Sequence, residues 1–153
     1  MNPHFLNKRL AHQLGFAGLL PFFLLMLGTW LADISWLGDF VRGQKAYAMV
    51  ILSFLGGIHW GAAMLCSTLS LNDTKKALMW GVTPSLIAWG ATLSGGFGMA
   101  VLMAGFITAL EVDKRMFSRY GMPEWLIRLR SRLTVAVVIT LAATVVGANL
   151  RGA

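Results

Sequence analysis

The sequence predicts an all-α membrane protein: a polytopic helix bundle with five transmembrane helices, forming one integral-membrane domain over residues 1–153. The chain is 57% hydrophobic and only 12% charged, and its mean hydropathy is +0.68. Between Leu14 and Leu150 it contains several long stretches free of Asp, Glu, Lys and Arg. Such stretches are expected to be helical in hydrocarbon, because a helix satisfies its backbone N–H and C=O groups internally where no water is available.

The charge of the chain indicates lipid rather than nucleic acid as its partner. The formal net charge is +7 and the isoelectric point is near 10.4. The basic residues lie in short loops between apolar runs, where they set orientation and meet anionic lipid. The single cysteine, Cys66, excludes an internal disulfide and a cysteine-based metal cluster.

The first predicted span covers residues 14–32 and follows a basic segment that contains Lys8 and Arg9. The run is longer than the apolar core of a usual signal peptide, so we interpret it as a retained helix. No presequence rich in arginine and serine precedes it. This favours a multi-pass protein of the bacterial inner (cytoplasmic) membrane.

The second predicted span covers residues 46–68 and carries a stripe of small residues. Ser53, Gly57 and Gly61 recur every four residues, which places them on one side of a helix. Small residues allow two membrane helices to approach closely. We therefore expect this stripe to pack against another helix.

The charge-free stretch from Ala77 to Leu110 is too long for one span. At 1.5 Å per residue it would extend about 51 Å, against a hydrocarbon core of roughly 30 Å. Ser94, Gly95 and Gly96 lie at its midpoint and are typical of a turn. The sequence therefore predicts two spans, over residues 77–93 and 97–112, and a re-entrant hairpin stays open as an alternative.

The fifth predicted span covers residues 133–150 and is preceded by a short interfacial helix. Pro123 and Glu124 suit the first turn of a helix. We expect Trp125 to lie at the depth of the lipid headgroups. Three arginines are expected to contact lipid phosphate: Arg128, Arg130 and Arg132.

The distribution of basic residues predicts the orientation. With five spans and the N-terminus inside, ten basic residues lie inside and three lie outside. With four spans the counts become five inside and eight outside. The positive-inside rule therefore favours five spans, with the N-terminus in and the C-terminus out.

His59 is the main candidate for a functional side chain, because it lies near the middle of the second span. An intramembrane histidine is a functional candidate by default. With Trp60 and Trp89 as walls, it would hydrogen-bond a small hydrophobic molecule such as a quinone. The alternative is a neutral histidine bonded to a neighbouring helix. A metal site is not expected, because Cys66 lies two helical turns away and no second intramembrane histidine is present.

Two spans share a Gly-x-x-Pro pattern, which ends at Pro21 in the first span and at Pro84 in the third. Proline removes a backbone N–H and kinks a helix. Paired helix breaks can mark a transporter site, so a small-solute transporter stays open as a third interpretation.

Motifs of soluble enzymes are absent from the sequence. It contains no phosphate-binding G-x-x-x-x-G-K-[ST], no H-E-x-x-H and no G-x-S-x-G. The few acidic residues are expected near the ends of spans, so no carboxylate relay is predicted inside the membrane. Glu111 and Asp113 are assigned to the end of the fourth span.

The chain resembles the transmembrane protein 69 family, also called the domain of unknown function 3429 family. The most specific part of the resemblance is the run Ile51–Gly61, with His59 near its end. Further matching residues are spread over nearly the whole chain: Gly18–Pro21, Pro84, Ser85, Leu86, Trp89, Asp113, Tyr120, Gly121, Pro123, Trp125, Leu129, Arg130, Leu133 and Thr134. The resemblance implies a small polytopic membrane protein found in bacteria, with mitochondrial relatives, and it brings no catalytic residues.

Together these features predict a non-catalytic accessory, assembly or lipid-contacting protein. Its expected partners are the lipid bilayer and another membrane protein or a second copy of the chain. No cofactor is expected, except that a quinone or lipid remains open as a ligand.

Overall fold

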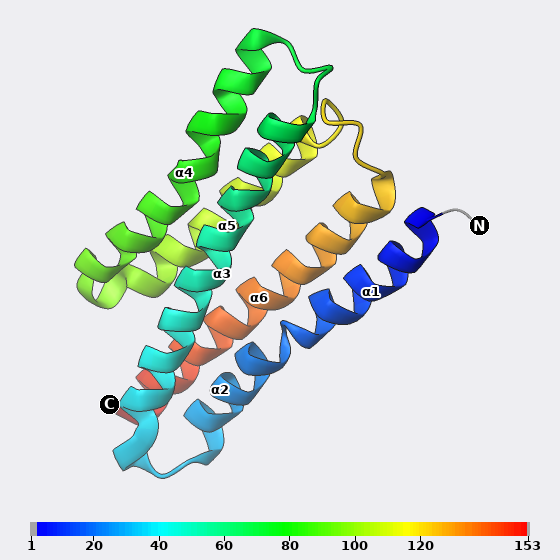
Figure 1. Ribbon diagram of the computed structural model, residues 1–153. Coiled ribbons are helices and arrows are strands. Elements are labelled where there is room, and N and C mark those ends of the chain that lie inside the picture. Colours follow the sequence, from blue (N-terminus) through cyan, green and yellow to red (C-terminus); the bar gives the residue numbers. More distant parts are fainter. Residues whose placement is uncertain (1–2, 153) are drawn as a thin grey trace. The chain divides into compact units, whose positions relative to one another are not determined.

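The computed structural model describes residues 3–152, which form helices joined by short turns and contain no strand. The helices lie in the order α1, α2, η1, α3, α4, η2, α5 and α6 (Figure 1). Their bounds are Pro3–Ala17 for α1, Leu20–Leu31 for α2, Ile34–Trp36 for η1, Leu37–Leu65 for α3, Leu71–Leu93 for α4, Gly95–Phe97 for η2, Gly98–Met116 for α5 and Glu124–Gly152 for α6.

The helices belong to two compact units, each of which is described by itself. The first unit contains the residues up to Gln44 and those from Arg128 onward. The second unit contains the continuous segment Lys45–Ile127. The first unit therefore joins segments from both ends of the chain, whereas the second is built from neighbouring helices.

In the first unit, α1 and α2 follow one another along α6 (Figure 1). The chain leaves α1 after Ala17 and re-enters a helix at Leu20, so Pro21 stands in the first turn of α2. Proline is accepted there because the N–H groups of a first turn have no partner within the helix. Where the sequence predicts a kink at Pro21 within one helix, the structure has a boundary between two helices.

Side chains of the first unit tie α2 to α6 through backbone oxygens. The Trp30 indole N–H donates to the Ala143 carbonyl over 3.1 Å. The Arg151 guanidinium donates to the carbonyls of Thr29 and Ala32, over 2.7 and 2.5 Å. These carbonyls lie at the end of α2, where a helix leaves its last oxygens without partners.

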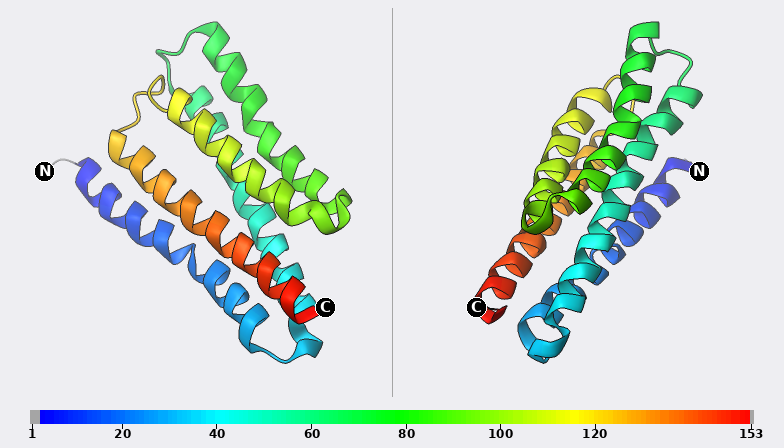
Figure 2. Two further views of the ribbon diagram at one scale, coloured as in Figure 1. Left: turned by 180° about the vertical axis from the view of Figure 1, so that it is seen from behind. Right: turned by 90° about the vertical axis from the view of Figure 1, so that its left-hand side faces the viewer.

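In the second unit, α4 and α5 form an antiparallel hairpin, which both sets of views show side by side (Figures 1 and 2). The predicted turn is present: α4 ends at Leu93, and η2 leads directly into α5. Gly95 has φ +52°, a conformation that residues with a Cβ rarely adopt. Pro84 lies inside α4, which continues through it to Leu93.

Four helical segments of the described chain are long and apolar enough to cross a membrane: Lys8–Leu31, Ile34–Leu65, Gly95–Met116 and Glu124–Gly152. They contain the first, second, fourth and fifth predicted spans almost entirely. α4 is not among them, and its first turns carry Asp73, Lys75 and Lys76. α4 is thus one further helix in addition to these four segments, and its charge-free part begins at Ala77.

The predicted interfacial helix is not a separate element. Residues from Glu124 onward form the first turns of α6, which runs to Gly152 without a break. The sequence between Glu124 and Val146 contains neither glycine nor proline, so nothing in it ends the helix before the apolar run.

The structure does not place the predicted stripe against another helix of the second unit. A Cβ placed on Gly57 or Gly61 would meet nothing within 4 Å in the described part of the chain. The Ser53 hydroxyl donates to the Met49 carbonyl of its own helix, over 2.9 Å. The close approach is one residue earlier, at Gly56, where a Cβ would lie 2.2 Å from the Gly81 carbonyl oxygen of α4.

We predict that Gly56→Ala destabilises the protein and that Gly57→Ala does not. The new methyl group at position 56 would overlap backbone of α4, which cannot move aside as a side chain can. Overpacking of this kind costs about 1–3 kcal/mol. The measurement is thermal unfolding of both variants in detergent, and Gly57→Ala controls for the gain in helix propensity. Equal unfolding temperatures would contradict the contact.

Candidate functional site

Three polar side chains form a hydrogen-bonded chain inside the second unit. The His59 Nε2 atom lies 2.9 Å from Oδ1 of Asp113, and its Nδ1 atom lies 2.8 Å from the Tyr120 hydroxyl. The exposed fractions are 0% for His59, 1% for Asp113 and 9% for Tyr120. The Asp113–His59–Tyr120 chain is therefore shielded from its surroundings.

Each member of the chain comes from a different element. His59 lies on the buried side of α3, together with Leu52 and Leu55. Asp113 lies in the last turn of α5. Tyr120 follows in the turn after α5, where the Met122 N–H donates to the Phe117 carbonyl over 3.0 Å.

A glycine completes this turn and returns Tyr120 to the helices. Gly121 has φ +68°, which favours glycine over any other residue. The turn thereby brings a side chain that follows α5 back to His59 of α3.

Apolar groups surround the hydrogen-bonded chain. The ring centroids of Phe117 and Tyr120 lie 5.8 and 5.7 Å from that of His59. Ala77 of α4 and Met116 of α5 belong to the same buried cluster. In such surroundings a polar group without a partner is costly, so each hydrogen bond of the chain contributes to the packing of α3 against α5.

The partners of His59 define the direction of its hydrogen bonds. A carboxylate only accepts, so we assign the proton on Nε2 to the bond with Asp113. In the neutral imidazole Nδ1 then accepts from the Tyr120 hydroxyl. Burial, followed by the negative charge of Asp113, raises the pKa of Tyr120 to about 12. Tyr120 therefore keeps its proton and remains a donor at neutral pH.

The predicted pocket of His59, Trp60 and Trp89 is not formed. Both ring nitrogens of His59 are occupied, and its ring is fully buried. The Trp60 indole instead packs over Gly81 and donates to the Leu78 carbonyl over 3.0 Å. Trp89 is 62% exposed and lies eight residues beyond Gly81, about 12 Å along α4. Since His59 meets Asp113 and Tyr120, it has no free nitrogen for a quinone carbonyl.

Asp113 lies in the last turn of α5, which agrees with its assignment to the end of the fourth span. Its burial and its hydrogen bond to His59 were not predicted. Asp113 and Tyr120 are seven residues apart, which is two helical turns, and both belong to the set on which the family resemblance rests. That spacing was the one signal in the sequence that Asp113 and Tyr120 could act together. The turn that brings Tyr120 back to His59 has no periodic pattern, so the sequence did not predict it.

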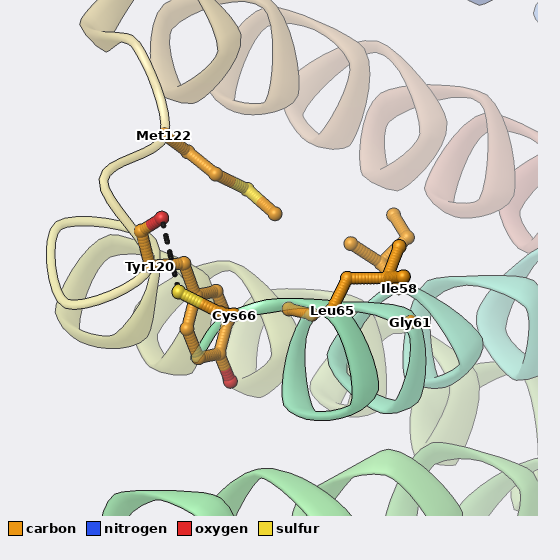
Figure 3. Close-up of a pocket in the computed structure, with 7 residues that line it drawn as sticks. Ile58, Gly61, Leu65, Cys66, Tyr120 and Met122 are labelled. Atoms are coloured by element: carbon orange, nitrogen blue, oxygen red, sulfur yellow. Dashed lines mark hydrogen bonds between the residues drawn. The ribbon is translucent and has the colours of Figure 1, made fainter. Parts of the chain in front are cut away.

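An apolar pocket lies next to the hydrogen-bonded chain, with a volume of about 450 Å³. Figure 3 shows Met122 extending from the turn after α5 toward α3. The Cys66 thiol donates to the Tyr120 carbonyl over 3.8 Å at its edge. The lining residues are Ile58, Gly61, Ala62, Leu65, Cys66, Tyr120 and Met122.

The predicted headgroup residues have different environments. Trp125 is half-buried, and Arg128 and Arg132 are exposed. Arg130 is only 7% exposed and donates to the Thr134 hydroxyl over 3.2 Å. Arg130 therefore cannot be assigned to lipid phosphate, because it belongs to the buried side of α6.

An ion pair joins α4 to the turn after α5. Arg119 pairs with Asp73 in the first turn of α4. The Ser70 hydroxyl donates to the Asp73 carboxylate over 2.8 Å and accepts from its backbone N–H over 3.1 Å. The hydrogen bond from Ser70, and then that from Arg119, lowers the pKa of Asp73, which stays charged at neutral pH.

Among the described residues, no group of three His, Cys, Asp or Glu side chains is placed to hold a metal ion. The Asp113–His59–Tyr120 chain contains one histidine, one carboxylate and one phenol. Its geometry supports hydrogen bonding between helices and the holding of a proton within the chain.

Comparison with known proteins finds a family model and relatives that match most of the sequence. Residues 7–146 match the family model described as "Protein of unknown function (DUF3429)". The chain is 32% identical over 148 residues to a Xenopus tropicalis protein named "Transmembrane protein 69", with 92% of this chain and 55% of that protein covered. It is 30% identical over 140 residues to the Mus musculus protein of the same name, with coverage of 88% and 54%.

The chain thus spans about half the length of the curated relatives that it matches. No solved structure matches the chain.

We predict a graded loss of stability when the hydrogen-bonded chain is interrupted. His59→Leu removes the imidazole N–H from the buried Asp113 carboxylate, and breaking a buried pair in this way costs about 3–5 kcal/mol. Tyr120→Phe removes only one hydroxyl, which costs about 1–3 kcal/mol. Unfolding in detergent measures both, with the exposed Ser118→Ala as control. A His59→Leu variant as stable as the control would show that the Asp113–His59–Tyr120 chain does not hold the helices together.

Proposed function

Because the chain belongs to the DUF3429 family of unknown function, which includes proteins named for their transmembrane character, we propose a function from its geometry. We propose that it is a non-catalytic accessory protein of a bacterial inner membrane. It acts by contact with lipid and with another membrane protein, and the Asp113–His59–Tyr120 chain fastens its helices.

The observation that carries this proposal is that the hydrogen-bonded chain leaves His59 without a free nitrogen. Both nitrogens of His59 are occupied by side chains of the same unit, and the ring has no exposed surface. A general base or a ligand-binding donor must reach its substrate within hydrogen-bond distance. Among the residues that the structure describes, the nitrogens of His59 reach Asp113 and Tyr120, which supports a structural role.

The outer surface supports contact with lipid. Large apolar side chains are exposed along the helices, including Leu24, Phe54, Leu86 and Ile139. In a membrane these side chains face hydrocarbon. Basic residues at the helix ends are suited to anionic headgroups.

Neither alternative gains support from the contacts. A quinone at His59 would need one of the nitrogens that Asp113 and Tyr120 occupy. A transporter built on paired helix breaks would need equivalent breaks, but Pro21 lies at a helix boundary and Pro84 lies inside a continuous helix.

We further propose five crossings, with the N-terminus inside and the C-terminus outside. α4 and α5 form an antiparallel hairpin. If α5 crosses the bilayer, α4 lies beside it over the charge-free residues from Ala77 onward. This arrangement places ten basic residues inside and three outside.

A structural role of the Asp113–His59–Tyr120 chain predicts that replacing all three side chains by apolar ones restores the function that a single replacement lowers. The triple variant His59→Leu, Asp113→Leu and Tyr120→Phe removes all the polar partners together, which can be nearly neutral where a single removal is costly. We expect Asp113→Leu alone to lower the amount of protein in the membrane and the triple variant to recover it.

The measurement is complementation of a strain that lacks the protein, with membrane abundance followed by immunoblot. A triple variant that is abundant and complements supports the accessory role. A triple variant that is abundant but does not complement would instead assign a proton-transfer or binding role to the polar groups.

The orientation predicts opposite labelling of two exposed positions. In a Cys66→Ser background, Ser35→Cys lies in the first outside loop and Ser118→Cys in the last inside loop. A membrane-impermeant maleimide should label the Ser35→Cys variant in intact spheroplasts and the Ser118→Cys variant only after permeabilisation. Labelling of both variants in intact spheroplasts would favour four crossings.

A further inference from the structure

The pocket beside Tyr120 has apolar walls and offers no free hydrogen-bond donor. Its walls are mainly aliphatic side chains and the thioether of Met122, an adaptable group that fits irregular apolar shapes. The Tyr120 hydroxyl is bonded to His59. Figure 3 shows this hydroxyl on the side away from Met122. A ligand here is therefore held by apolar contact and not by recognition of a carbonyl.

A glycine on α3 leaves room for the pocket. Gly61 is one of its lining residues, and a Cβ at that position would meet nothing within 4 Å. The volume of about 450 Å³ is within the range of roughly 300–1,000 Å³ that is usual for ligand pockets. Ile58 and Leu65 belong to the last two turns of α3, inside a helix that is apolar enough to cross the bilayer.

Positive charge gathers at the same end of the second unit. The ion pair of Arg119 with Asp73 and the contact of Cys66 with Tyr120 bring the end of α3, the start of α4 and the end of α5 together. Exposed basic residues of these helix ends that are not used to pair an acidic residue here are Lys75, Lys76 and Arg115. The acidic residues of α4 and α5 are already paired: Asp73 with Arg119, Glu111 with Lys114, and Asp113 with His59.

We propose that this pocket holds one acyl chain of an anionic phospholipid, whose headgroup contacts the exposed basic residues of α4 and α5. The proposal rests on the lipid-contacting function and names its site. An acyl chain suits walls without a free donor, whereas a quinone would leave its carbonyls without partners. The excess of positive charge selects an anionic headgroup over a zwitterionic one.

The test uses the purified full chain in detergent, exchanged into equal amounts of phosphatidylglycerol and phosphatidylcholine with the same acyl chains. Lipid that stays bound is measured by native mass spectrometry. Gly61→Leu fills the pocket. Gly57→Leu is the matched control, because it adds the same side chain one turn earlier on α3 at a position that does not line the pocket.

We expect the wild type and Gly57→Leu to retain phosphatidylglycerol in preference to phosphatidylcholine. Gly61→Leu should reduce that retention by about tenfold, which corresponds to 1.4 kcal/mol. The double variant Lys75→Gln and Lys76→Gln should lose the preference for phosphatidylglycerol and still retain lipid.

Equal retention by Gly61→Leu and Gly57→Leu would overturn the assignment of the pocket. Equal retention of both lipids by the wild type would overturn the anionic headgroup. A wild-type dimer that dissociates in Gly61→Leu without loss of lipid would assign the pocket to a second copy of the chain. None of these outcomes alters the complementation by the apolar triple variant, so failure of the site and failure of the accessory function are distinguishable.

Discussion

The absence of water in hydrocarbon is the constraint on which this structure depends. Every polar group inside the bundle must find a partner in the protein. Two tryptophans of the chain do so through backbone carbonyls of other helices, Trp30 through Ala143 and Trp60 through Leu78. The same demand explains why His59 is bonded at both nitrogens.

Close helix packing follows from the same constraint, because lipid supplies no hydrophobic drive between helices. Glycines allow the backbones to approach where contact matters. Gly56 lies against Gly81, and a side chain at Gly105 would overlap Leu52 and Ile87. Exposed Gly57 differs from these glycines only in its position on the helix, which shows that a small residue alone does not identify the packed side.

The fold was largely predictable from the sequence, because charge-free runs and turn residues determine where membrane helices begin and end. The turn before α5 was recognised in this way, whereas the boundary between α1 and α2 was expected as a kink at Pro21. The packed side of α3 was not, because Gly56 and Gly57 are equally small and only the neighbouring helix distinguishes them.

The candidate site was predicted only in part. His59 was identified from its position within a span, but its partners were not. Asp113 lies on another helix, and Tyr120 reaches His59 through an irregular turn. Contacts of this kind depend on tertiary structure, which the periodicity of a single helix does not encode. The exposure of Trp89 has the same origin, since no feature of its own helix placed it away from His59.

The order in which the segments of the two units are synthesised affects how the protein assembles in the membrane. The segment Lys45–Ile127 is contiguous, so its helices can associate as soon as α5 has entered the membrane. α2, in contrast, receives Arg151 at its last carbonyls only when the end of α6 has been synthesised. During translation, the first helices to be made therefore wait longest for their partners, and lipid or an insertion factor must cover them in the interval.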